Sequence, residues 1–243
     1  MPPKLNISST EAEVLNNLAG FFIETGKEAI AGHGRFSVSL SGGSSPKKLY
    51  ELLASAAYKD QLDWTKVDFF FGDERNVKHT DKDSNYLMAK TAMFDALQIN
   101  PNQVFPVDTN YEPADAAKAY TEAILGYFKD KPVVFDLVLL GLGDNSHTAS
   151  LFPHTPILHD DSVSVKEVWL EDQQVYRISM TAPMINNAKN IAFLVYGEGK
   201  AIAVHHVLED ARDIDEYPAQ LIRKDEDVQW FLDTAAASRL KNK

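Results

Sequence analysis

Four short apolar runs, each followed directly by a polar or glycine-containing segment, constrain what this chain of 243 residues can fold into. Runs of this length and composition are typical of buried β-strands, and stretches with helical periodicity recur between them. Strands that alternate with helices predict an α/β fold, a mostly parallel sheet with helices on both faces. The runs and their following segments are 36–40 with SGGSSP, 67–71 with GDER, 133–140 with GLGDNSHT, and 191–196 with GEGK.

Weaker patterns between these runs complete the expected order of elements. Further strands are expected at 104–107, 175–180 and 228–232, and helices at 47–57, 84–97, 113–128, from GEGK to about residue 208, and at 235–240. Ser84 and Pro113 are suited to the first turns of their helices. No linker, repeat or low-complexity tract divides the chain, so we expect a single domain over residues 1–243.

Charge and cysteine content exclude several classes of function. The chain has 24 Lys+Arg against 35 Asp+Glu, a formal net charge of -11, which disfavours nucleic acid and anionic membrane surfaces as partners. It has no cysteine, which excludes disulfides, thiol catalysis and Cys-ligated metals. The N-terminal residues contain no run resembling a signal sequence, and no apolar stretch is long enough to cross a bilayer. We therefore expect a cytoplasmic protein; its oligomeric state stays open.

The four polar segments are expected to meet at one place in the fold. In open α/β sheets, ligands bind outside the carboxyl ends of the strands. One of these segments, Ser41-Gly42-Gly43-Ser44, has the chemistry of a phosphate-binding loop. Its glycines let the backbone approach an anion closely, and the next helix offers free N–H groups. A plain glycine turn before a helix is the alternative, and both interpretations stay open. Arg177 and Lys200 are either exposed charges or the cations that a phosphate requires.

His147 is the candidate acid or base, because it follows two glycines at a strand end. The GDER segment, with Asp73 and Arg75, is either a surface salt-bridge cluster or part of the site. No pair among the seven histidines has the spacing of a metal-binding motif, so no metal is expected. A GxSxG elbow is also absent from the sequence, which leaves a serine nucleophile without support.

At these residues the chain resembles the 6-phosphogluconolactonase family, whose relatives include glucosamine-6-phosphate deaminase/isomerase. The resemblance extends from the SGGSSP loop almost to the C-terminus. It rests on linked motifs in order: LSGGSSPKKLYELL, FFFGDERNV…DSNY, GLGDNSHTASLFP, RISM, GEGKA and YPAQLI…VQWFLDTAAAS. It implies a fold similar to that of the glucosamine-6-phosphate deaminases and an enzyme without metal or cofactor.

The resemblance also implies roles for individual residues. It assigns the phosphate loop to Gly42, Gly43 and Ser44, its cationic partners to Arg177 and Lys200, the sugar site to Asp73 and Arg75, and the general base to His147. The family segment usually reads GxGxDGHTASLFP, whereas this chain has Asn145 and Ser146 in place of Asp-Gly. Asn145 can still hydrogen-bond in the substrate site but adds no negative charge. We therefore expect the acidic limb of the pH–rate profile near the ordinary histidine pKa of about 6.5.

The function expected from the resemblance is hydrolysis of 6-phospho-D-glucono-1,5-lactone to 6-phosphogluconate, with a histidine base. One alternative is an isomerase/deaminase acting on amino sugar phosphates. It is disfavoured because HTASLFP matches the lactonase branch, while the deaminases resemble HIAFNEP at this place. The other alternative is a non-catalytic sugar-phosphate-binding protein on the same fold.

Overall fold

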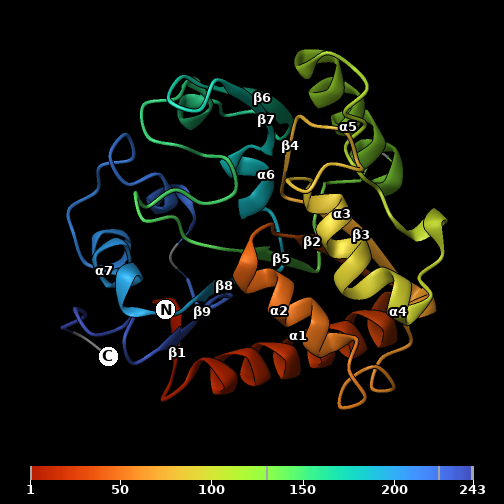
Figure 1. Ribbon diagram of the computed structural model, residues 1–243, viewed down its shortest axis with the longest axis horizontal. Coiled ribbons are helices and arrows are strands. Elements are labelled where there is room, and N and C mark those ends of the chain that lie inside the picture. Colours follow the sequence, from red (N-terminus) through yellow and green to blue (C-terminus); the bar gives the residue numbers. More distant parts are fainter. Residues whose placement is uncertain (1, 130, 224, 242–243) are drawn as a thin grey trace.

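A six-stranded parallel sheet forms the centre of the computed structural model, which describes residues 2–129, 131–223 and 225–241 (Figure 1). The strand order is β1-β9-β8-β5-β2-β3, and each neighbouring pair runs parallel. Its strands are β1 (Lys4–Ser8), β2 (Phe36–Leu40), β3 (Val67–Phe71), β5 (Leu137–Leu140), β8 (Asn190–Val195) and β9 (Val228–Asp233). The sequence prediction of a mostly parallel sheet is confirmed.

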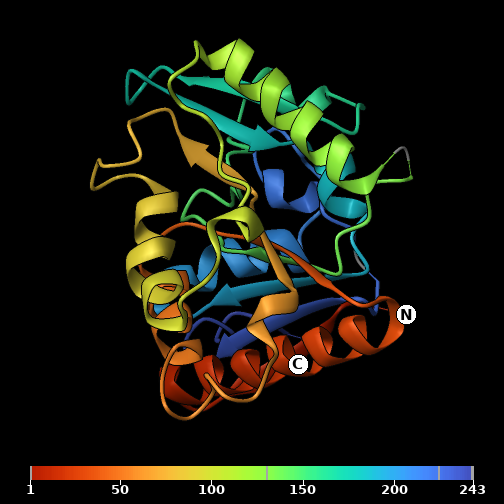
Figure 2. The same cartoon turned by 90° about the vertical axis from the view of Figure 1, so that its right-hand side faces the viewer.

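Both faces of this sheet are buried, which explains the continuous apolar runs in the sequence. In β5, for example, Leu137 and Leu139 pack into one hydrophobic cluster while Val138 and Leu140 pack into the other. Helices cover both faces, with α1 along the lower side in Figures 1 and 2. The helices are α1 (Glu11–His33), α2 (Ser44–Leu53), α3 (Asn85–Ala89), α4 (Asp95–Leu97), α5 (Pro113–Phe128), α6 (Ala182–Asn186) and α7 (Ala201–Leu208).

A second, antiparallel sheet of three strands lies at the opposite end of the molecule from α1 (Figures 1 and 2). It has the order β4-β7-β6, formed by β4 (Asp73–Arg75), β7 (Val175–Met180) and β6 (Val165–Leu170). Helix α5 packs against β6 and β7. The strand at 175–180 was predicted, but β6 was not. The short strand β4 begins one residue after Gly72, so the chain passes from the large sheet to the small one at the GDER segment.

Several predicted elements are confirmed and others are wrong. The helix over 113–128 has the predicted bounds, and the Ser84 hydroxyl caps α3 by accepting from the Leu87 N–H. The predicted strand at 104–107 is reduced to one isolated bridge between Val104 and Phe69. The predicted helix at 235–240 consists of turns. In the described residues, no helix combines the length and hydropathy needed to span a membrane.

Candidate active site

A cavity of about 310 Å³ opens where the large sheet's carboxyl edge meets the small sheet. Three of the four polar segments singled out in the sequence line it, together with β7. Its lining comprises Ser41, Gly42, Gly43, Asp73, Arg75, Gly141, Leu142, Gly143, His147, Thr148, Ala149, Ser150, Phe152, Gln173 and Arg177. The expected convergence of strand-end segments therefore takes place, and it collects one imidazole, one carboxylate and two guanidinium groups in one cavity.

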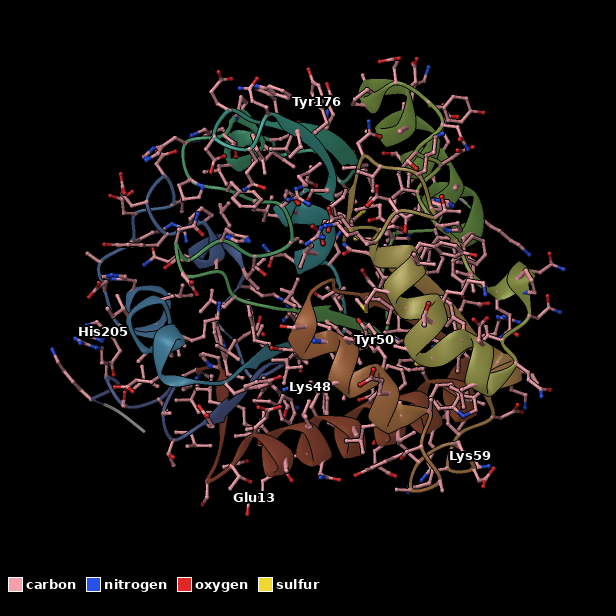
Figure 3. The ribbon with its side chains drawn as sticks, viewed as in Figure 1. Glu13, Lys48, Tyr50, Lys59, Tyr176 and His205 are labelled. Atoms are coloured by element: carbon pink, nitrogen blue, oxygen red, sulfur yellow. The ribbon has the colours of Figure 1, made fainter. Side chains whose placement is uncertain are left out.

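The SGGS segment connects β2 to α2 and is anchored from below by Tyr50. The Tyr50 hydroxyl accepts from the Ser41 N–H at 3.0 Å and donates to the Ser41 carbonyl at 2.8 Å. Tyr50 belongs to α2 and is fully buried near the middle of the molecule (Figure 3). Gly43 has a φ of 105° and immediately precedes α2. The free N–H groups and positive dipole end of α2 thus lie beside the cavity, an arrangement suited to an anion.

Gly42 is required by a close contact with Asn85. A Cβ at position 42 would lie 2.0 Å from the Asn85 side-chain oxygen, so only glycine fits. Asn85 begins α3, and its side-chain amide donates to the Asp73 carbonyl at 2.9 Å. The sequence predicted that glycine would allow an anion to approach here. The structure shows in addition that it allows Asn85 to connect the SGGS loop with β4.

His147 is held by contacts on both sides of its ring. A Cβ on Gly143 would lie 2.0 Å from the His147 Nδ1 atom, so the ring rests directly against the backbone of Gly143. The Phe152 ring is stacked on the imidazole, with centroids 4.0 Å apart and an interplanar angle of 21°. The His147 Nδ1 atom hydrogen-bonds to the Asn145 Oδ1 atom. An amide oxygen only accepts, so Nδ1 carries the proton and Nε2 carries the lone pair.

Burial lowers the pKa of His147 to about 4, because an apolar environment disfavours the charged ring. The charge of Asp73 acts in the opposite direction, while Lys200 and Arg177 lower the pKa further. Asp144 also raises it, but less than Asp73 does. The expectation of an ordinary pKa near 6.5 is therefore wrong, because it considered only charges and not the burial of the ring. At pH 7 the ring is neutral, and its Nε2 lone pair carries no proton.

The loop that carries His147 has an uncommon backbone. Ser146 has a φ of 61° and Ala149 a φ of 47°, both in the left-handed region that favours glycine. Its conformation is fixed by hydrogen bonds, including Ser146 N–H to the Gly143 carbonyl at 3.0 Å and Ala219 N–H to the Ser146 carbonyl at 2.9 Å. Position 146 is one of the two where this chain departs from the family segment. The usual glycine would adopt this φ without strain.

Arg75 and Arg177 form a pair of like charges at the cavity. They are directly opposite each other in the antiparallel pairing of β4 with β7. Arg75 donates to the Asp83 carbonyl at 2.9 Å and Arg177 to the Gln173 side-chain oxygen at 2.9 Å, and both Nε atoms are buried without a partner. In the described ranges neither guanidinium forms an ion pair with a carboxylate. Burial and the charge of Arg75 lower the pKa of Arg177. An anion would relieve this repulsion.

The two carboxylates of the GDER segment have different surroundings. Asp73 lines the cavity and accepts a hydrogen bond from Ser150. Glu74 is buried instead and accepts from the N–H groups of Arg75, Asn85 and Tyr86 at 2.7–2.9 Å. Burial raises the pKa of Glu74, and these bonds offset part of that rise. Glu74 thus fixes the start of α3 to β4, while Asp73 is available to a ligand.

Three of the expected site residues lie outside the cavity lining. Lys200 forms an ion pair with Asp144, with its Nζ atom 2.5 Å from the carboxylate, and Ser44 lies in the first turn of α2. Asn145 acts on the site through His147. Ser41 was included in the candidate phosphate-binding loop, but Thr148, Ser150, Phe152 and Gln173 were not assigned from the sequence. Three of these four belong to the quoted motif HTASLFP, so that motif carried a usable signal.

In the described part of the chain, no group of three or more histidine, aspartate or glutamate side chains is placed to hold a metal ion. The pair His205 and His206 instead forms ion pairs with Glu209 and Asp210 at the end of α7. The chemistry available in the cavity is therefore that of a neutral imidazole, a carboxylate and two arginines.

The fold and the cavity together define an open α/β sheet protein with an arginine-lined cavity at the carboxyl edge of its strands. Residues 9–230 match the family described as glucosamine-6-phosphate isomerases/6-phosphogluconolactonase. A 6-phosphogluconolactonase of Nostoc sp. is 40% identical over 218 residues, which cover 87% of this chain and 88% of that protein. The chain belongs to this family.

Solved structures agree with this assignment. The 6-phosphogluconolactonase from Trypanosoma cruzi is 27% identical with a TM-score of 0.87, covering 99% of this chain and 97% of that one. A monomeric glucosamine-6-phosphate deaminase has a TM-score of 0.83 at 22% identity, covering 97% of this chain and 99% of that one, and so shares the fold. The predicted similarity to the deaminase fold is confirmed.

Proposed function

We propose that the chain hydrolyses 6-phospho-D-glucono-1,5-lactone to 6-phosphogluconate, with His147 as the base. The observation that carries this proposal is the cavity's pairing of a neutral, tautomer-fixed imidazole with two arginines that have no carboxylate partner among the described residues. A phosphorylated lactone needs these two functions, one to activate water and one to hold the phosphate. The names of the similar proteins support the same substrate.

The phosphate is held between Arg75, Arg177 and the loop of Gly42 and Gly43. Guanidinium groups bind phosphate oxygens through parallel N–H donors, and α2 adds its free N–H groups. Both arginines line the cavity and, in the described residues, form no ion pair with a carboxylate. Lys200 is bound to Asp144 at the rim and contributes less to the phosphate site than Arg177 does.

The chemical step uses the lone pair on the His147 Nε2 atom. This atom takes a proton from a water molecule while the water oxygen forms a bond to the C1 carbonyl carbon. The bond between C1 and the ring oxygen then breaks, and the departing oxygen receives the proton from the imidazolium. Asn145 keeps the proton on Nδ1 throughout, and the negative charge of Asp73 stabilises the transient imidazolium.

The proposal is tested by an assay on the purified protein with freshly prepared 6-phospho-D-glucono-1,5-lactone. Lactone loss is followed with the spontaneous hydrolysis rate subtracted, and unphosphorylated gluconolactone serves as the matched substrate. We expect rapid turnover of the phosphorylated lactone and poor turnover of the other. Ammonia release from glucosamine 6-phosphate would favour the deaminase alternative, and ligand binding without turnover the sensor alternative. Equal rates on both lactones would contradict the phosphate site.

A further inference from the structure

Ser150 has a buried hydroxyl that the reaction described above does not use. Its side chain lies three residues after His147, is 1% exposed, and lines the cavity. The Ser150 Oγ atom donates to the Asp73 Oδ2 atom at 2.7 Å, and the Ser150 N–H donates to the Ser179 hydroxyl oxygen at 3.2 Å. Ser179 in turn donates to the Met180 carbonyl at 3.0 Å. Ser150 therefore connects the His147 loop with β4 through its hydroxyl and with β7 through its backbone N–H.

The contact to Ser150 fixes one side of the Asp73 carboxylate. Asn85 holds the other side, because its side-chain amide bonds to the Asp73 carbonyl at 2.9 Å and approaches Oδ1 at 3.5 Å. A charge-assisted hydrogen bond of the length seen between Ser150 and Asp73 is among the stronger kinds in proteins. With both sides held, the carboxylate has one orientation toward the cavity it shares with His147.

The orientation of Asp73 matters because His147 has a neutral partner on its Nδ1 atom. In the described residues, no carboxylate hydrogen-bonds to His147. The charged groups that act on the ring are Asp73 from β4, Arg177 from β7, Lys200 from the turn before α7 and Asp144 from its own loop. Of these, Asp73 has the largest effect and favours the charged ring. The carboxylate that supports proton transfer is therefore Asp73 on β4, whereas the base lies on the loop after β5.

We propose that Ser150 is a positioning residue, whose hydroxyl holds the Asp73 carboxylate in the orientation that stabilises the imidazolium formed at His147. The inference rests on the proposed lactone hydrolysis. Ser150 itself forms no covalent bond and transfers no proton. The water proton moves to His147 and then to the ring oxygen, as described above. The role of Ser150 is thus exerted entirely through Asp73, which makes it separable by experiment from a general effect on folding.

The first measurement compares kcat and KM of Ser150→Ala with those of the unmodified protein. We expect kcat to fall by about 10- to 100-fold, the scale of a hydrogen bond to a charged group. KM should change by less than about threefold, because the phosphate contacts are untouched. Ser150→Cys keeps the size and a weak donor, so it should recover part of the lost kcat. The matched control is Ser39→Ala, a buried serine whose hydroxyl donates a weak hydrogen bond to the Met180 sulfur at 3.7 Å.

The decisive test is a double-mutant cycle with Asp73→Asn. If Ser150 acts through Asp73, adding Ser150→Ala to Asp73→Asn should lower kcat no further. A merely structural role would lower kcat by the same factor in both backgrounds, and that result, or an unchanged kcat in Ser150→Ala, would overturn the inference. Thermal melts of each variant report folding, and Ser150→Cys replaces the alanine variant in the cycle if the latter does not fold. An unmodified protein without lactone turnover would instead refute the proposed function, and this inference with it.

Discussion

Buried charged side chains have different partners at the two edges of the large sheet. At the amino edge, Asp68 and Asp136 are each 2% exposed and fully paired. Asp68 accepts from Arg35 and from the Tyr127 hydroxyl, and Asp136 accepts from Lys189 and His33, both at 2.8 Å. At the carboxyl edge, Arg75 and Arg177 face each other without a carboxylate partner. One edge satisfies its buried charges within the chain, and the other leaves them for a ligand.

The pKa directions express the same difference. Burial acts to raise the pKa of Asp136, but hydrogen bonds from Lys189, Ser37 and His33 outweigh it and hold that pKa below its usual value. For Arg177, burial and Arg75 both act in the same direction and lower the pKa. The amino edge therefore contributes to stability, which falls only when acid protonates Asp136. At the carboxyl edge, the repulsion between the two arginines lowers stability, and a bound anion would relieve it. Such a loss of stability is expected of a functional site.

The largest difference between the two edges should be the change in kcat when a histidine at each edge is replaced. His147→Ala should lower kcat by about 10²–10⁴-fold, the usual contribution of a positioned proton-transfer group, with KM little changed. The matched control is His33→Ala at the amino edge, which should leave kcat unchanged. Steady-state kinetics on the phosphorylated lactone measure both. A His147→Ala protein with nearly full kcat would show that another group activates the water.

The next largest effect is that substitutions at the carboxyl edge should change KM, whereas a substitution at the amino edge should change stability. Arg177→Ala should raise KM by about 10- to 150-fold, because a charge-assisted contact to phosphate is lost, and should not lower the melting temperature. Lys200→Ala should raise KM less, since Lys200 is bound to Asp144. Asp136→Ala should do the reverse, lowering the free energy of unfolding by about 1–3 kcal/mol by leaving the Ser37 donors unpaired. Denaturant melts and KM values for all three test this, and a destabilised Arg177→Ala protein would contradict it.

The carboxyl edge was also the more predictable of the two. Strands that alternate with helices along the chain form a parallel sheet, and the carboxyl ends of its strands lie at one edge. This rule placed SGGS, GDER and His147 at one cavity. The amino-edge pairs were not predicted, since Arg35, Asp68 and Asp136 lie at or just before the starts of three strands whose order is a tertiary property. Helix α1 was also not predicted, although Thr10 and Glu13 form a capping box at its start, nor were β1, β4 and β6. The pKa of His147 was misjudged because the stacking of Phe152 on the ring and the burial of the ring have no periodic signature.

A smaller effect concerns the pH dependence of the carboxyl edge. Because burial lowers the pKa of His147 to about 4, the ring is charged and inactive only below that pH. We expect kcat/KM to fall on the acid side near pH 4. Asn145→Asp should place a carboxylate at Nδ1, favour the charged ring, and move the limb upward by about 1–3 pH units. Profiles of both proteins from pH 3.5 to 8 measure this. An unmoved limb in Asn145→Asp would show that His147 is not the titrating group.

The smallest effect concerns backbone strain beside the base. Ser146 has a φ of 61°, a conformation that costs a non-glycine residue on the order of 1 kcal/mol or more. Glycine removes this strain but loses about 0.5–1 kcal/mol in additional chain entropy, so the net gain is small. Ser146→Gly should raise the melting temperature by about 2 °C. Ser39→Gly makes the same chemical change in the extended backbone of β2, where glycine relieves no strain, and should lower it. If both substitutions lowered the melting temperature, the strain at Ser146 would be offset by contacts of its buried side chain, and the departure from the family's glycine would stabilise this loop.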